Sequence, residues 1–236
     1  MNLHTLVVVF AAGLMTTSGA WSQAPAPATS DGLVAVKSRD LDQVFVRPNA
    51  DLAGYRKVII DQPRVSFEAG WLKSINSTRD VSRWLTPAYQ QQLTDDLTAG
   101  MARTMANVFA NRGYEVVTAP GPGVLRVMPQ VTELFLYAPD LKSASPTREF
   151  SRDTGRATLM LEARDAVTGN LLARIVDTSL ARELMSGNRI GQLNYTTDVS
   201  NLFWMDALFR QWTTSCVVAF AGGTPKVGLA ATVDRL

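Results

Sequence analysis

The sequence predicts an α+β fold, with a mainly antiparallel sheet covered on one face by two long amphipathic helices. Two helical patterns of apolar residues, at 86–113 and 198–221, and two strand patterns joined by a turn within 156–179 carry this prediction. Apolar residues recur every three or four positions in the helical patterns and every second position in the strand patterns. Each element therefore has one apolar side, and helices packed on one face of a sheet bury all of these sides.

The first strand is predicted within residues 55–67, YRKVIIDQPRVSF. Its β-branched run Val58-Ile59-Ile60 favours an extended backbone. Pro63 lacks the N–H that a strand interior needs, so we expect the strand to be interrupted or bulged there.

The first long helix is expected to begin at the N-cap Thr86, with Pro87 at its first position, and to end at Gly113. Its apolar side is formed by residues three or four positions apart, namely Tyr89, Leu93, Leu97, Met101, Met105 and Val108. A short strand at 114–118 and a long strand at about 124–137 are predicted to follow.

A β-hairpin is predicted from Arg156 to Ser179. Apolar and polar residues alternate in its first half, as in a strand with one buried face. Asp165 to Asn170 is expected to form the turn, with Gly169 at a positive φ and the Asp165 side chain capping the turn backbone. Leu171 to Thr178 then returns as the partner strand.

The second long helix is expected from the N-cap Asp198 to just before Gly222. At about 100° per residue its large apolar residues share one face; they are Leu202, Met205, Leu208, Phe209, Trp212, Cys216 and Phe220. Cys216 is therefore predicted to be buried and unreactive.

A signal peptide is predicted at residues 1–20. Its apolar run, Leu6–Leu14, is much shorter than the roughly 20 residues that span a bilayer. Small residues in Ser18-Gly19-Ala20 favour cleavage after Ala20, and a second possible cleavage site follows Ala24. The alternative interpretation of this segment is a buried N-terminal strand.

The rest of the chain is expected to form one domain. Residues 21–53, which include the Pro- and Ala-rich stretch APAPATS, are expected to be a linker and an N-terminal extended segment. Residues 54–223 form the predicted α+β domain, and residues 224–236 a C-terminal tail.

Composition excludes several kinds of chemistry. His4 is the single histidine and lies in the predicted leader, so the exported chain would lack Ser-His-Asp triads, Cys-His triads and His-bearing metal sites. Cys216 is the single cysteine, which excludes an internal disulfide. A net charge of +2 without basic runs gives no electrostatic reason to expect nucleic-acid binding. We identify no catalytic, cofactor-binding or metal-ligating residue.

Three blocks of the sequence resemble a known bacterial family. They are DGLVAVKSRDLDQVFVRPNADLAGYRKVIIDQPRVSF (31–67), FANRGYEVVTAPGPGVLRV (109–127) and TGRATLMLEARDAVTGNLLAR (154–174). Together they are similar to the family called domain of unknown function 3313. The resemblance implies a small secreted envelope protein of no established activity, and many members of the family are lipoproteins. Trp21 stands where a lipoprotein has its lipidated cysteine, so we expect a free periplasmic protein.

The segment 68–84, EAGWLKSINSTRDVSRW, is the candidate interaction surface. It has no clear apolar period and is longer than most connections in a compact domain. It carries Trp71 and Trp84 together with the basic residues Arg79 and Arg83. Trp and Arg are enriched where binding energy is concentrated, so the four side chains are expected to bind an acidic partner. The alternative is that both tryptophans fold back over the end of the sheet.

Two classes of function follow from these observations. The favoured one is a non-enzymatic binding or interaction module of the periplasm, without a transmembrane segment, whose partner is an envelope protein or polymer of unknown identity. The alternative is a carboxylate-based hydrolase that acts on envelope polymers, because two carboxylates distant in the chain can meet in a fold. The sequence does not indicate an oligomeric state.

Overall fold

The computed structural model describes residues 29–136, 150–151, 155–180, 194–195 and 198–222. The predicted signal peptide, the APAPATS stretch up to residue 28 and the predicted C-terminal tail lie outside these residues.

The main sheet has eight strands in the order β1-β2-β9-β8-β6-β3-β5, with β4 also paired to β6. Their bounds are Val34–Val36 (β1), Gln43–Val46 (β2), Lys57–Ile60 (β3), Arg64–Phe67 (β4), Glu115–Val116 (β5), Val124–Leu136 (β6), Gly155–Asp165 (β8) and Leu171–Leu180 (β9). In this order, the neighbouring strands β1, β2, β9, β8 and β6 pair antiparallel, whereas β3 and β4 each pair with β6 in parallel. The prediction of a mixed α+β fold with a mainly antiparallel sheet is confirmed.

Several local predictions for the strands are also confirmed. The strand at 55–67 is interrupted at Pro63, where β3 and β4 separate. In the hairpin turn, the Asp165 carboxylate accepts the backbone N–H groups of Val167 at 3.1 Å and Thr168 at 2.7 Å. Gly169 has a φ of +71°, which a glycine adopts without steric cost. A separate small sheet pairs Phe150–Ser151 (β7) with Asn194–Tyr195 (β10).

The N-terminal strands β1 and β2, from the expected extended segment, extend the main sheet beyond β9. A buried carboxylate fixes this junction. Asp177 of β9 accepts the backbone N–H of Asp42 at 3.0 Å and the indole N–H of Trp212 at 2.6 Å, and the Asp42 carboxylate accepts the backbone N–H of Thr178 at 2.9 Å. Residues 34–46 are therefore part of the folded body.

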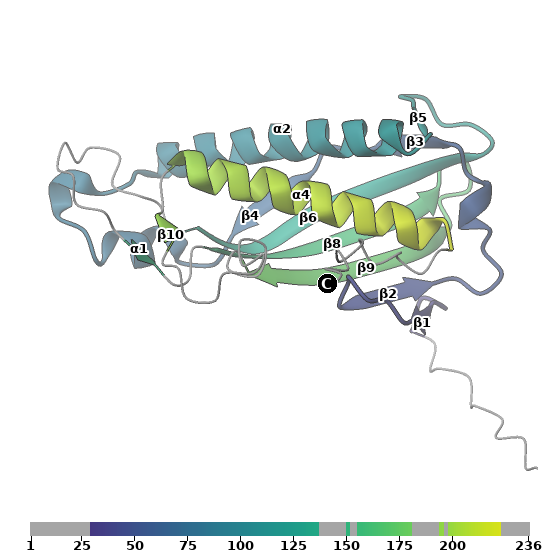
Figure 1. Cartoon of the computed structure of the whole chain (residues 1–236), viewed down its shortest axis with the longest axis horizontal. Coiled ribbons are helices and arrows are strands. Elements are labelled where there is room, and N and C mark those ends of the chain that lie inside the picture. The colour runs from purple at the N-terminus through teal and green to yellow at the C-terminus, as the bar shows by residue number, and fades with distance from the viewer. Residues whose placement is uncertain (1–28, 137–149, 152–154, 181–193, 196–197, 223–236) are drawn as a thin grey trace, which may run out of the picture.

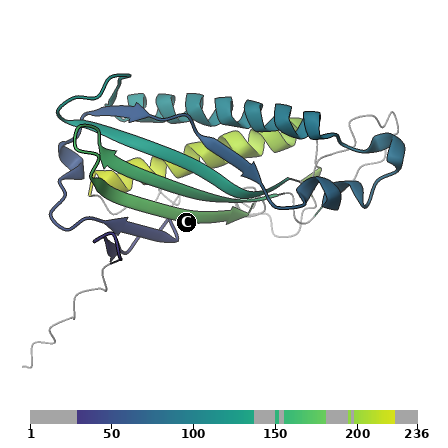
Figure 2. The ribbon, with the colours of Figure 1, turned by 180° about the vertical axis from the view of Figure 1, so that it is seen from behind.

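The long helices are Pro87–Asn111 (α2) and Asp198–Phe220 (α4). Thr86 caps α2, because its side chain accepts the backbone N–H of Tyr89 at 3.2 Å. In Figure 1, α4 crosses in front of the sheet and α2 runs beside it. Figure 2 shows the other side of the sheet, with α4 behind the strands.

The two helices pack against each other and share one hydrophobic core with the sheet. α2 contributes Leu97, Met101, Met105 and Phe109 to this core, and α4 contributes Trp204, Met205, Leu208, Phe209, Trp212, Cys216, Val217 and Phe220. Gly155 of β8 allows the close approach of α4, since a Cβ there would lie 2.5 Å from the ring of Trp204.

Candidate functional site

The segment 68–84 is more regular than the sequence predicts. It contains a short helix, Trp71–Asn76 (α1), and a 3₁₀ turn, Val81–Arg83 (η2). α1 follows Gly70, whose φ of +78° turns the chain into the helix. With Trp71 and Ile75 as its buried residues, this helix is too short to show an apolar period in the sequence.

Trp71 lies in the core and not on the surface. Its side chain is 1% exposed, and the centroid of its ring lies 4.2 Å from that of Phe67. Its indole N–H donates to the backbone oxygen of Leu136 at 2.8 Å. This burial corrects the expectation that Trp71 anchors a partner, because a buried ring offers no contact area. Trp71 instead folds back onto the end of the sheet, as the alternative interpretation of this segment expected.

Trp84 has the opposite placement. Its side chain is 52% exposed, and its indole N–H donates to the backbone oxygen of Arg79 at 3.2 Å. Val81, which precedes it by three residues, is 72% exposed. Sequence reasoning missed Val81, although an apolar residue three positions from a tryptophan in a polar segment is a visible signal.

The tip that carries Val81 and Trp84 extends beyond the sheet next to α1, on the left in Figure 1. Its shape is fixed from within, because the Asn76 side chain donates to the backbone oxygen of Leu85 at 2.9 Å and accepts its N–H at 2.8 Å. Arg79 and Arg83 lie on the same segment as Trp84, and Arg83 lies 4.0 Å from the Asp80 carboxylate. Of the four predicted site residues, the structure therefore brings three to the tip and places Trp71 beneath it.

A hollow of about 710 Å³ lies at the break between β3 and β4, and its lining includes Met128 and Gln130 of β6 and Met160 and Glu162 of β8. Glu162 accepts hydrogen bonds from Arg164 at 2.7 Å and from Arg174 at 2.8 Å. Burial raises the pKa of Glu162, but the two arginines outweigh burial and hold the pKa below its ordinary value. The Glu162 carboxylate that lines this hollow is therefore fixed in place and favoured in its ionised form.

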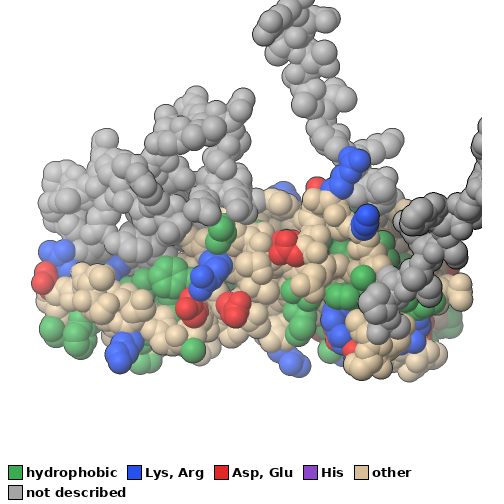
Figure 3. Space-filling model, turned by 90° about the horizontal axis from the view of Figure 1, so that it is seen from below, with side chains coloured by type: hydrophobic (Ala, Val, Ile, Leu, Met, Phe, Trp, Pro, Cys, Tyr) green, Lys and Arg blue, Asp and Glu red, His purple; other side chains and the backbone are tan. Residues whose placement is uncertain are grey.

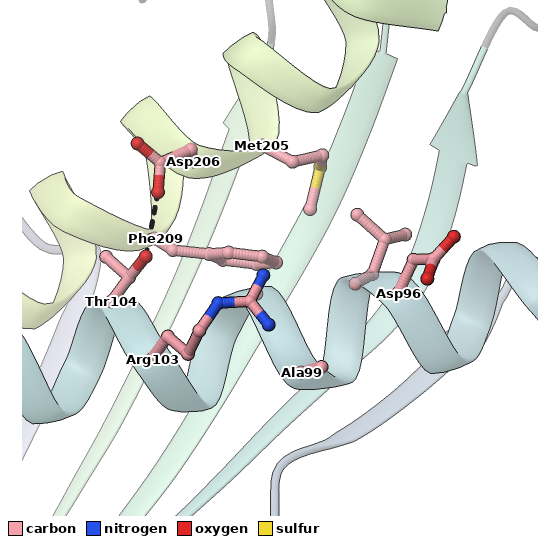
Figure 4. A pocket seen from close by; sticks show the side chains of 9 residues that line it. Asp96, Ala99, Arg103, Thr104, Met205, Asp206 and Phe209 are labelled. Carbon is pink, nitrogen blue, oxygen red and sulfur yellow. Dashed lines mark hydrogen bonds between the residues drawn. The ribbon is translucent and has the colours of Figure 1, made fainter.

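A second hollow of about 420 Å³ lies between α2 and α4. Its floor consists of buried apolar side chains, Leu97, Met205 and Phe209, and the charged residues Asp96, Arg103 and Asp206 stand around it (Figure 4). Asp206 accepts hydrogen bonds from Arg210 at 2.8 Å and from Thr104 at 2.7 Å, which lower its pKa. Thr104 thereby links α2 to α4.

The described residues show little that is suited to acid–base or metal chemistry. A glycosidase-type site needs one carboxylic acid that stays protonated, whereas Glu162 and Asp206 are held as carboxylates. Burial raises the pKa of the Cys216 thiol, which disfavours the reactive thiolate. Within the described ranges, no group of three or more His, Cys, Asp or Glu residues could hold a metal ion.

Seen from below, basic and acidic side chains are interspersed, and neither sign forms a continuous area on that face (Figure 3). None of the described helices combines the length and apolar character of a membrane span.

A family model described as "Protein of unknown function (DUF3313)" matches residues 25–203. Among solved structures, the chain is similar to the PelC dodecamer from Paraburkholderia phytofirmans, with 12% identity and a TM-score of 0.38 over 76% of this chain and 96% of that one. It is also similar to a DUF330 protein from Xanthomonas campestris, with 13% identity and a TM-score of 0.33 over 79% and 94% of the two chains. A DUF4136 family protein from Bacteroides thetaiotaomicron shows 9% identity and a TM-score of 0.31 over 83% and 100%. A search of curated proteins finds no match.

Proposed function

The chain belongs to the DUF3313 family, and we propose that it is a non-enzymatic binding module of the bacterial envelope that contacts its partner through the tip formed by Val81 and Trp84. Export would rest on the leader at residues 1–20, and Trp21 in place of a lipidated cysteine would leave the protein free in the periplasm. An N-terminus at Trp21, without an acyl group, is the expected result of mass spectrometry on protein recovered from cells. An intact Met1 or a fatty-acid mass would contradict export in this form.

The exposure of Val81 and Trp84, at 72% and 52%, is the observation that carries the proposal. A tryptophan that docks into a partner typically contributes about 2 kcal/mol or more to binding. The indole N–H of Trp84 already has an acceptor in the backbone oxygen of Arg79. The ring can therefore be covered by a partner without leaving a buried donor unsatisfied.

The charges around the tip favour an acidic partner. The segment 68–84 carries Lys73, Arg79 and Arg83 against two acidic residues, Glu68 and Asp80, and Glu68 is paired with Arg156 of β8 at 2.7 Å. Basic groups at the rim of an apolar contact steer association with negatively charged surfaces and make it sensitive to salt. An envelope protein or polymer that bears carboxylates fits this arrangement.

The hydrolase alternative gains no support from the two hollows. Two of the carboxylates that line them, Glu162 and Asp206, are each bonded to arginine side chains that favour the ionised form. A general acid would need a carboxyl group whose pKa is raised.

The test compares recovery of partners from an envelope extract and from purified peptidoglycan by the wild-type protein and by Trp84→Ala. We expect Trp84→Ala to weaken binding by at least about tenfold, which corresponds to roughly 1.4 kcal/mol. Val167→Ala is the matched control, because Val167 is similarly exposed at 62% but lies in the hairpin turn. Equal recovery by wild type and Trp84→Ala, with both proteins folded, would refute the proposed surface.

A further inference from the structure

The exposed face of α2 carries two charged side chains that are not paired within the described structure. Asp96 and Arg103 are seven positions apart and point to the same side of the helix, but neither makes a hydrogen bond or an ion pair with another described residue. Arg103 acts on Asp206 of α4 only through its charge, as the last of the causes that lower the pKa of that carboxyl. Asp96 and Arg103 are too far apart along the helix to pair with each other, because helical ion pairs form three or four positions apart.

The polar residues of this face form complementary pairs at equal distances from the point between Ala99 and Gly100. Asp96 precedes this point by as many positions as Arg103 follows it, and the same holds for the amides of Gln92 and Asn107. At about 100° per residue, all of these residues lie within an arc of roughly 100°. Apart from the half-buried Gly100, they are exposed.

We propose that a second copy of this chain packs on this face of α2, with the two α2 helices antiparallel and the two-fold axis passing between Ala99 and Gly100. A two-fold interface is self-complementary, so every contact occurs twice. In this arrangement Asp96 of each copy faces Arg103 of the other, and Gln92 faces Asn107. The two charges that form no ion pair within the described part of one chain are then both paired.

Gly100 supports the same position for the axis. A glycine inside a helix is less favourable than alanine, because it loses more backbone freedom on folding. A Cβ on Gly100 would meet only the end of the Arg103 side chain, at 4.0 Å. The chain itself therefore does not need glycine here, whereas a second helix can approach most closely where side chains are smallest.

The hollow between α2 and α4 lies directly beside this contact (Figure 4). Asp96 and Asp206 both line it. Asp206 stands at the other end of the hollow, where it is bonded to Thr104, about 12 Å along α2 from Asp96.

The dimer would hold two binding tips at opposite ends. Each α2 begins about 19 Å from the axis, so the two starts lie about 38 Å apart at 1.5 Å per residue. If the tips bind as proposed above, a dimer would engage a repetitive envelope polymer at two points and gain avidity. This consequence rests on the proposed function, but the dimer itself does not.

The test uses charge reversal and sedimentation velocity on the mature chain. Wild-type protein is expected to dimerise, and Asp96→Arg and Arg103→Asp should each weaken dimerisation at least about tenfold, because each places like charges opposite each other. A mixture of the two variants should form a heterodimer with near wild-type affinity. In it, the arginine introduced at position 96 faces the aspartate introduced at position 103, and the unchanged Arg103 and Asp96 of the two copies face each other. Recovery of this kind cannot come from misfolded protein.

Asp95→Arg is the matched control, because Asp95 lies next to Asp96 but about 100° further round the helix; it should dimerise like wild type. Gly100→Leu should abolish dimerisation by filling the contact, whereas Trp84→Ala should leave it intact. A monomeric wild-type protein up to about 0.1 mM, a dimer insensitive to Asp96→Arg, or single variants that fail to associate when mixed would each overturn the proposal.

Discussion

Replacing Trp71 by alanine should destabilise the fold much more than replacing Trp84. The Trp71 ring is 1% exposed and lies against Phe67, and its N–H satisfies the backbone oxygen of Leu136. Truncation of a buried tryptophan typically costs about 3–5 kcal/mol, because apolar contacts are lost and a cavity remains. The Leu136 oxygen would also lose its donor in a buried site, which alone costs about 1–3 kcal/mol.

Urea unfolding followed by circular dichroism measures this difference as a change in the free energy of unfolding. We expect a loss of about 3 kcal/mol or more for Trp71→Ala and less than about 0.5 kcal/mol for Trp84→Ala. Trp71→Phe is the intermediate variant, because it keeps an aromatic ring beside Phe67 but removes the N–H donor and one ring of the indole. Its cost should be at least the roughly 1–3 kcal/mol of the lost donor and less than that of Trp71→Ala.

A Trp71→Ala protein as stable as the Trp84→Ala protein would contradict this account. It would mean that α1 and the tip are not held by the Trp71 ring, and that the segment 68–84 folds independently of the sheet. Binding data on Trp84→Ala are interpretable only when this difference in stability is observed.

Two further predictions concern polar contacts between distant parts of the chain. Asp177→Ala should lower the free energy of unfolding, measured with urea, by about 3 kcal/mol or more. The reason is that the indole N–H of Trp212 and the backbone N–H of Asp42 lose their acceptor. A loss below about 1 kcal/mol would contradict the role of this carboxylate. Burial, and then the hydrogen bond to Asp165, raise the pKa of Tyr55 from 10.0 to about 12. The protonated phenol is thus favoured in the fold, so its contribution should be complete below pH 10 and disappear as the pH rises through about 12. Absorbance at the phenolate band checks this value against the Tyr55→Phe variant, and a folded protein without a phenol titrating near pH 12 would contradict it.

The elements that can be predicted from the sequence alone are those whose signals are local. Thr86 and Pro87 define the start of α2 because an N-cap hydroxyl and a proline at the first position act within one turn. Asp165 and Gly169 define the hairpin turn for the same reason, since the carboxylate bonds backbone groups two and three residues away. The alternation along β8 likewise separates core from surface, because neighbouring side chains on a strand point to opposite faces.

Which tryptophan of the segment 68–84 is buried depends instead on tertiary contacts. Both lie in a segment without an apolar period, so nothing local distinguishes them. Trp71 is buried because distant parts of the chain meet around it: Leu136 supplies the acceptor, and Leu93 and Phe135 belong to the apolar side chains packed against its cluster. Trp84 finds its acceptor five residues away, at Arg79, and its ring is 52% exposed. Burial depends on contacts between distant residues, which a one-dimensional pattern does not contain.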